Sequence, residues 1–114
     1  MSRDPRLYLE DIIETMEKMQ GFVAGMTRAE LEADDKTAFA VMRGFQIIGE
    51  AARRVPETIQ TAYSEVPWSL MIGMRNRITH DYLGIDYAIV WRTIHEDFPS
   101  VLPDLKRALR ELSP

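Results

Sequence analysis

The chain has 114 residues, a formal net charge of −4, 46% hydrophobic and 28% charged side chains, and no cysteine. This length fits one domain with a single core, and the composition is that of a folded protein rather than a disordered one. The lack of cysteine excludes disulfides and thiolate chemistry, and no apolar run approaches the roughly 20 residues that a membrane-spanning helix needs. We therefore expect a single cytoplasmic domain over residues 1–114, without a secretion signal.

The first predicted helix begins at Pro5, because Asp4 is a favourable N-cap residue and proline is favoured at the first helical position. Apolar residues then recur at helical spacing, and Gly21 and Gly25 mark the end of the segment. The apolar face consists of Leu9, Ile12, Ile13, Met16, Met19 and Val23.

A second long helix is predicted from the aspartate pair at 34–35 to a position just before Pro56. Its apolar stripe consists of Ala38, Met42, Phe45, Ile48, Gly49, Ala52 and Val55. Gly44 and Gly49 lie inside this helix, where each glycine costs roughly 1 kcal/mol relative to alanine. We expect another helix to approach closely there, from the same chain or from a partner chain.

The rest of the chain is predicted to form further helices. They are a short helix within residues 56–63, a helix from Pro67 to about His80, a piece over 87–98 that Asp86 caps, and a last helix that starts around Pro99. No segment shows the alternation of apolar and polar residues that is typical of a strand. The sequence therefore predicts an all-α fold, an antiparallel bundle of four or five helices.

Residues 74–82, MRNRITHDY, depart from the acidic character of the chain. Asp and Glu are absent from residues 66–80, whereas residues 1–42 carry five basic and nine acidic side chains. A negative net charge opposes long-range attraction of nucleic acid. An anion site must therefore be local, or must be strengthened by the pairing of two copies of the basic segment.

Arg75 and His80 have side chains that suit phosphate chemistry. A guanidinium binds phosphate oxygens in a bidentate manner, and histidine can act as general acid or base near neutral pH. The two residues lie about 140° apart on an ideal helix, so they converge only if the helix end loosens around His80 or if Arg75 reaches round. Asn76 could orient His80 or bind the substrate. Alternatively, Arg75 and Arg77 are solvated residues, and His80 caps a helix C-terminus.

Arg75, His80 and Tyr82 match an R-x4-H-x-Y motif, and the chain resembles HepT toxins of the HEPN ribonuclease superfamily. Residues 45–56, 67–86 and 89–105 also resemble segments of that family, in the same order, whereas the first 30 or so residues resemble it only loosely. The resemblance implies a HEPN-like homodimer whose two motifs face each other across a composite cleft.

The resemblance also implies the activity and the partners. It implies a metal-independent endoribonuclease toxin without a cofactor, with Arg75 and His80 as the catalytic pair and Asn76 as a polar helper. We expect Arg77 to bind the RNA substrate, because a two-fold dimer doubles the charge of Arg75 and Arg77. The implied partner is a minimal nucleotidyltransferase antitoxin that modifies Tyr82 with AMP, which adds bulk and negative charge where RNA enters.

Two other interpretations stay open. In the first, the chain is a non-catalytic helical module that binds a nucleotidyltransferase or an RNA without cutting it. In the second, His80 and Asp81 belong to a metal phosphohydrolase, but that chemistry needs further ligands, and the second histidine, His95, lies downstream. We therefore expect no metal site. We also expect no membrane-surface role, because no helix pairs a strong apolar face with a face rich in Lys and Arg.

Overall fold

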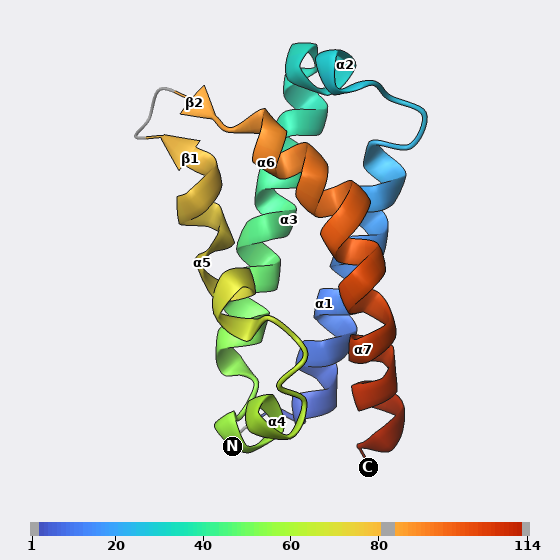
Figure 1. Cartoon of the computed structure of the whole chain (residues 1–114), viewed down its shortest axis with the longest axis vertical. Helices are drawn as coiled ribbons and strands as arrows, with labels where there is room; N and C mark the ends of the chain where they lie inside the picture. The colour runs from blue at the N-terminus through green and yellow to red at the C-terminus, as the bar shows by residue number, and fades with distance from the viewer. Residues whose placement is uncertain (1–2, 81–83, 113–114) are drawn as a thin grey trace.

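The computed structural model describes residues 3–80 and 84–112, with His80 described by its backbone alone. The elements are α1 (Pro5–Phe22), α2 (Arg28–Ala33), α3 (Asp35–Arg54), α4 (Glu57–Ala62), α5 (Trp68–Ile78), β1 (Thr79–His80), β2 (Gly84–Ile85), α6 (Tyr87–Arg92), the π-helical turn η1 (Thr93–Asp97) and α7 (Phe98–Glu111). Figure 1 shows α1, α3, α5 and the continuous segment from α6 to α7 running side by side. The predicted all-α antiparallel bundle is confirmed for the part of the chain that the structure describes.

Aspartate side chains begin the two long N-terminal helices, as the sequence predicts. The Asp4 carboxylate accepts a hydrogen bond from the Arg6 backbone N–H at 3.0 Å, and Pro5 follows it. The Asp34 carboxylate accepts one from the Thr37 backbone N–H at 3.2 Å. A further bond from the Thr37 hydroxyl is the main reason that the pKa of Asp34 lies below its ordinary value. Both caps satisfy N–H groups that a helix start leaves without partners.

The short helix α2 has no counterpart among the predicted elements. Thr27 and Glu30 form a capping box, in which the Thr27 hydroxyl accepts from the Glu30 N–H at 3.1 Å and the Glu30 carboxylate accepts from the Thr27 N–H at 2.9 Å. This T-x-x-E pattern is a recognised start signal, so the sequence did contain the information. α2 lies near α6, where burial and the charges of Asp35 and Glu32 raise the pKa of Tyr87.

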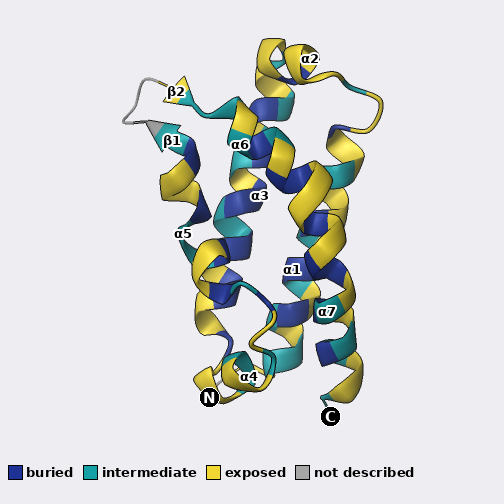
Figure 2. Cartoon of the chain, in the orientation of Figure 1, coloured by how far each residue is buried: buried dark blue, intermediate teal, exposed yellow. Residues whose placement is uncertain are grey.

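The core lies around α3, which packs against α1 on one side and α5 on the other. Figure 2 shows that the buried positions of the long helices face one another inside the bundle. The largest fully buried side chains include Phe45 and Ile48 of α3, Leu9 and Met16 of α1, and Leu105 of α7. Burial of such side chains is the main stabilising contribution, at about 1.5–3 kcal/mol each.

Two glycines of α3 mark where neighbouring helices approach most closely. A Cβ atom on Gly44 would collide with the side chain of Met19 in α1. A Cβ atom on Gly49 would lie 3.2 Å from the backbone carbonyl oxygen of Ile72 in α5. In both cases the neighbouring helix belongs to the same chain. The sequence had left open whether it belonged to the same chain or to a partner chain.

The last helix, α7, begins at Phe98, within one residue of its predicted start around Pro99. It does not follow a break, because α6, η1 and α7 form one continuous helical segment. A proline has no N–H and its ring crowds the carbonyl group four residues before it, whereas a π-helical turn changes this spacing directly before Pro99. Two side chains satisfy carbonyl groups at the turn: the Thr93 hydroxyl donates to Ile89 O at 2.7 Å, and His95 Nδ1 lies 2.9 Å from Trp91 O.

We predict that Gly49→Leu lowers the free energy of unfolding by about 1–3 kcal/mol, because the new side chain must displace the backbone of α5. Gly21→Leu is the matched control, because a Cβ atom on Gly21 of α1 meets nothing within 4 Å. Leucine there should stabilise the protein by about 0.8 kcal/mol through its better helix propensity. Urea unfolding of both variants measures the difference, and equal effects would contradict the close approach of α3 and α5.

Candidate functional site

The helix α5 ends at Ile78, two residues before His80. Thr79 has extended backbone angles, with φ −104° and ψ 134°. Thr79 then pairs with Ile85, and His80 with Gly84, in a two-stranded antiparallel ladder that the sequence did not predict. His80 therefore lies on extended backbone. The helix thus ends before His80. The angle of about 140° between Arg75 and His80 assumes an ideal helix through both residues, and so it does not apply.

Local chemistry explains why the helix ends there. Ile78 and Thr79 are consecutive β-branched residues, which favour extended backbone over helix. The Thr79 hydroxyl donates to the Arg75 carbonyl oxygen at 2.9 Å, and the Asp86 N–H donates to the Ile78 carbonyl oxygen at 2.7 Å. These bonds satisfy carbonyl groups that a helix end leaves without partners. They also fix the start of the extended segment against the start of α6.

Arg75, Asn76 and Arg77 are exposed in the last turn of α5. Among the described residues, no carboxylate forms an ion pair with either arginine, whereas Arg107 of α7 pairs with both Glu65 and Glu111. Cations are favoured at a helix C-terminus by roughly 0.3–1 kcal/mol, so the two arginines are tolerated there without a carboxylate. Both guanidinium groups are therefore available to an external anion.

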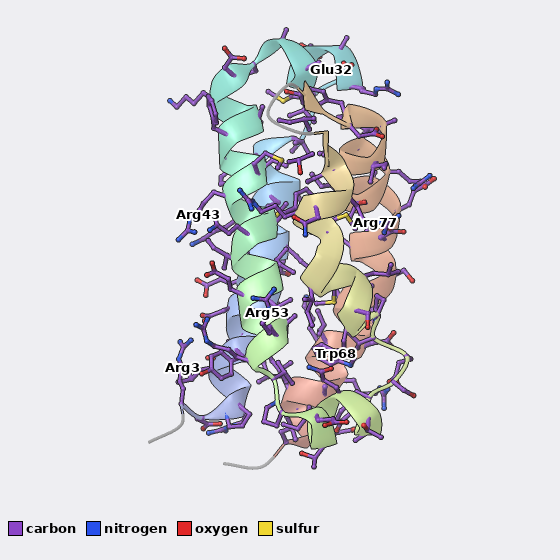
Figure 3. All side chains as sticks on the ribbon, turned by 90° about the vertical axis from the view of Figure 1, so that its left-hand side faces the viewer. Arg3, Glu32, Arg43, Arg53, Trp68 and Arg77 are labelled. Carbon is purple, nitrogen blue, oxygen red and sulfur yellow. The ribbon has the colours of Figure 1, made fainter. Side chains whose placement is uncertain are left out.

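Arg75 and Arg77 point to different sides of α5, because residues two apart lie about 200° apart around a helix. In Figure 3, Arg77 lies on the side of α5 that faces the C-terminal helical segment. There it lines a groove of about 250 Å³ between α5 and the segment of η1 and α7. Arg77 and Arg75 thus face separate regions, although both belong to the basic segment.

The two remaining residues of the motif are only partly placed. His80 is described by its backbone, and Tyr82, the predicted AMP acceptor, lies outside the described residues together with Asp81. His95 is exposed in η1, and its ring stacks on Trp91 with centroids 3.9 Å apart.

The groove is the part of the site that sequence reasoning missed. Its lining includes Met71 and Met74 of α5, Phe45 of α3, and Asp97 and Phe98 of the C-terminal segment. The exposed Leu70 lies on its rim, with 51% of its surface accessible. The sequence offered one sign of the groove, since the apolar residue Leu70 lies beside the buried stripe of α5. The opposite wall of the groove could not be predicted, because it is formed by segments that are distant in the sequence.

Within residues 3–80 and 84–112, no three or more side chains of His, Cys, Asp or Glu gather in a way that could hold a metal ion. In the same residues, no helix has the length and apolar character needed to cross a bilayer.

The fold and the site define an all-α protein in which a helix with two exposed arginines in its last turn leads into an extended segment that carries His80. The chain belongs to the HepT-like family, "Ribonuclease HepT-like", whose family model matches residues 12–112. The resemblance inferred from the sequence is thereby confirmed.

Several curated relatives match nearly the whole chain. A protein of Thermococcus cleftensis named "Probable ribonuclease HepT" is 39% identical over 89% of this chain and 92% of its own length. A "Putative RNase" of Methanocaldococcus jannaschii is 34% identical over 96% of this chain and 91% of its own. A "Putative RNase" of Caldanaerobacter subterraneus is 33% identical over 96% and 97%. No solved structure matches the chain.

We predict that Thr79→Val lowers the free energy of unfolding by about 1 kcal/mol, because it removes the bond to the Arg75 carbonyl while keeping a β-branched side chain. Thr61→Val is the control, since Thr61 is exposed in α4 and, among the described residues, makes no side-chain hydrogen bond. Thermal unfolding monitored by circular dichroism compares the two. Indistinguishable midpoints would show that this bond does not help to end α5.

Proposed function

We propose that this protein is a metal-independent endoribonuclease that acts as the toxin of a toxin–antitoxin pair. The observation that carries the proposal is its membership of the HepT-like family together with the intact R-x4-H-x-Y motif. The ending of α5 before His80 supports it, as does the exposed Arg75, which forms no ion pair with a carboxylate of the described residues 3–80 and 84–112.

The proposed reaction uses Arg75 and His80 on one phosphodiester. The neutral imidazole of His80 removes the proton of a ribose 2′-hydroxyl, and the 2′-oxygen forms a bond to the adjacent phosphorus. The bond between phosphorus and the 5′-oxygen breaks, and that oxygen receives a proton. Arg75 stabilises the negative charge on the oxygens of the pentacoordinate phosphorus through two of its N–H donors. The products are a 2′,3′-cyclic phosphate and a 5′-hydroxyl, and no metal or cofactor enters the balance.

The protonation of the leaving oxygen is the reason to propose a homodimer. One histidine cannot easily serve as base and acid in the same step, so the imidazolium of His80 from a second copy is proposed as the acid. A two-fold dimer also brings together two segments that lack carboxylates over residues 66–80. The local positive charge then doubles, which offsets the net charge of −4 that each chain carries.

The neighbouring polar residues have supporting roles in this proposal. Asn76 is exposed beside Arg75 in the last turn of α5, so its amide can hydrogen-bond the substrate or the His80 ring. Arg77 is proposed to bind an RNA phosphate outside the reacting one, since it faces a different side of α5. Phosphate contacts of this kind position an RNA chain without selecting its sequence.

The proposed control is covalent. A minimal nucleotidyltransferase antitoxin transfers AMP from ATP to the Tyr82 hydroxyl: the tyrosine oxygen bonds to the α-phosphorus, pyrophosphate leaves, and the hydroxyl proton is released. Tyr82 lies two residues after His80 in the sequence. A bulky anionic group attached there would repel the RNA backbone and would block access to the motif.

The decisive experiment is RNA cleavage by the purified protein in EDTA. We predict that His80→Ala and Arg75→Ala each lower the cleavage rate at least about 100-fold, since general acid–base and electrostatic stabilisation contribute this much or more. His95→Ala and Arg110→Ala are the matched controls and should retain the wild-type rate, because both residues lie on other helical segments.

The products and the oligomeric state complete this test. Wild-type cleavage should leave 2′,3′-cyclic phosphate and 5′-hydroxyl ends. Equal cleavage rates for wild type and both motif variants would indicate that the protein is a non-catalytic binding module and not an enzyme. Full activity of a monomer in sedimentation at the assay concentration would contradict the composite site.

Modification of Tyr82 can be tested separately from RNA cleavage. Incubation with the cognate nucleotidyltransferase and ATP should add AMP to the wild-type chain, and Tyr82→Phe should abolish the gain, as intact mass spectrometry can measure. Tyr87→Phe is the control and should be modified like wild type, because Tyr87 is half-buried at the start of α6. An unchanged gain in Tyr82→Phe would place the acceptor on another residue.

A further inference from the structure

The groove between α5 and the C-terminal segment contains a fixed arrangement of apolar and charged groups. Its floor and walls include Phe45, Met71, Met74 and Phe98, which are buried side chains of the core. Its volume is about 250 Å³, and it is open to solvent along the exposed Leu70. Methionine and phenylalanine side chains make favourable contacts with an aromatic ring.

Opposite charges lie on the two walls of the groove. Arg77 comes from α5 and Asp97 from the end of η1, and both side chains are exposed. Asp97 precedes α7 but forms no capping hydrogen bond with it. Neither side chain forms an ion pair within the part of the chain that the structure describes. Glu65 also lines the groove, but its carboxylate is held by Arg107.

The position of Arg77 connects the groove with the motif. Arg77 lies three residues before His80 in the sequence, at the end of α5 that leads into β1. A phosphate bound by Arg77 would therefore lie near the motif, while the base of the same nucleotide could enter the groove towards Met74 and Met71. Unstacked bases of single-stranded RNA bind in this way, with their faces on apolar side chains and their edges hydrogen-bonded.

We propose that this groove binds one base of the single-stranded RNA substrate, and that Asp97 selects guanine. The proposal rests on the proposed ribonuclease function and deepens it by naming a specificity-determining residue. A carboxylate offers two acceptor oxygens and no donor. Guanine presents two adjacent donors, N1–H and the N2 amino group, on its Watson–Crick edge, and so matches both oxygens. Arg77 holds the phosphate of the same nucleotide and does not discriminate between bases.

Methionine methyl groups provide a readout that needs no cleavage. The chain has seven methionines, of which Met16, Met71 and Met74 line the groove and Met26 and Met42 do not. The experiment titrates the full-length protein, labelled with ¹³C at the methionine methyl groups, with 5′-GMP, 5′-AMP, 5′-CMP and 5′-UMP. We expect shifts at Met71 and Met74 and none at Met26 and Met42, with 5′-GMP binding about tenfold more tightly than the others.

Two variants separate the roles of the charged residues. Asp97→Asn should remove the preference for guanine, whereas Arg77→Ala should weaken the binding of all four nucleotides to the same extent. Asp104→Asn is the control for Asp97→Asn, since Asp104 lies on α7 outside the groove lining. Leu70→Trp adds bulk at the exposed rim and should abolish the shifts at Met71 and Met74 if the groove is the binding site.

A 2′-O-methylated tetranucleotide containing guanosine distinguishes RNA from free nucleotide, because it cannot be cut by attack of a 2′-hydroxyl. Tighter binding of the tetranucleotide than of 5′-GMP is expected. Equal binding of the two, absence of shifts at Met71 and Met74, or an unchanged guanine preference in Asp97→Asn would each overturn the proposal. If the groove binds a base but the protein cleaves no RNA, the groove is a base-binding site and the proposed ribonuclease function is wrong. Failure of the groove proposal and failure of the proposed function therefore give different results.

Discussion

The close contact between α3 and α5 determines where the candidate site lies. Gly49 allows the backbone of α5 to approach α3 to the point where an added Cβ would lie 3.2 Å from the Ile72 carbonyl oxygen. Because no side chain separates the two backbones at Gly49, they pack closely, and close packing leaves little freedom for rotation or sliding. The direction of α5 is thereby fixed in its middle, and its last turn, with Arg75, Asn76 and Arg77, occupies a defined position beside the core.

That constraint also explains how a buried helix can present charged groups. Met71, Met74 and Ile78 fix α5 on the core side, while Arg75 and Asn76 remain exposed. The helix then ends because β-branched residues and the bonds of Thr79 and Asp86 favour extended backbone. The transition from helix to strand changes the direction of the chain directly after the basic residues, and this change brings His80 out of the helical register.

The sequence predicted those features that depend on local chemistry. Asp4 and Asp34 cap their helices as expected, and Pro56 follows the end of α3. The R-x4-H-x-Y motif and the collinear segments led to the family, which the comparison confirms. The capping box of Thr27 was present in the sequence but was overlooked, because α2 has a single buried residue, Leu31, and so no apolar periodicity.

Other features depend on which segments meet, and these could not be predicted from local pattern. The groove joins Met74 of α5 to Phe98 of α7, residues that are far apart in the chain. Likewise, Gly44 and Gly49 indicated close packing but not whether the neighbouring helix belonged to the same chain. Pro99 indicated the start of α7 within one residue, but not that α7 continues from η1 without a break. Proline normally ends a helix, whereas the π-helical turn before Pro99 relieves the crowding.

The π-helical turn also preserves the alignment of the core along the C-terminal segment. Val90, Ile94 and Phe98 are all buried and are spaced four residues apart. Over eight residues, a regular α-helix would turn about 80° beyond two full rotations, so Val90 and Phe98 would not face the same side. The wider turn takes up this difference, as one inserted residue would. In a sequence lacking one residue between 93 and 97, Val90 and Phe98 would be seven residues apart, about 20° short of two full rotations of a regular α-helix. Such a sequence would therefore form an unbroken α-helix in which α6 keeps its orientation and Tyr87 its place near Glu32 and Asp35.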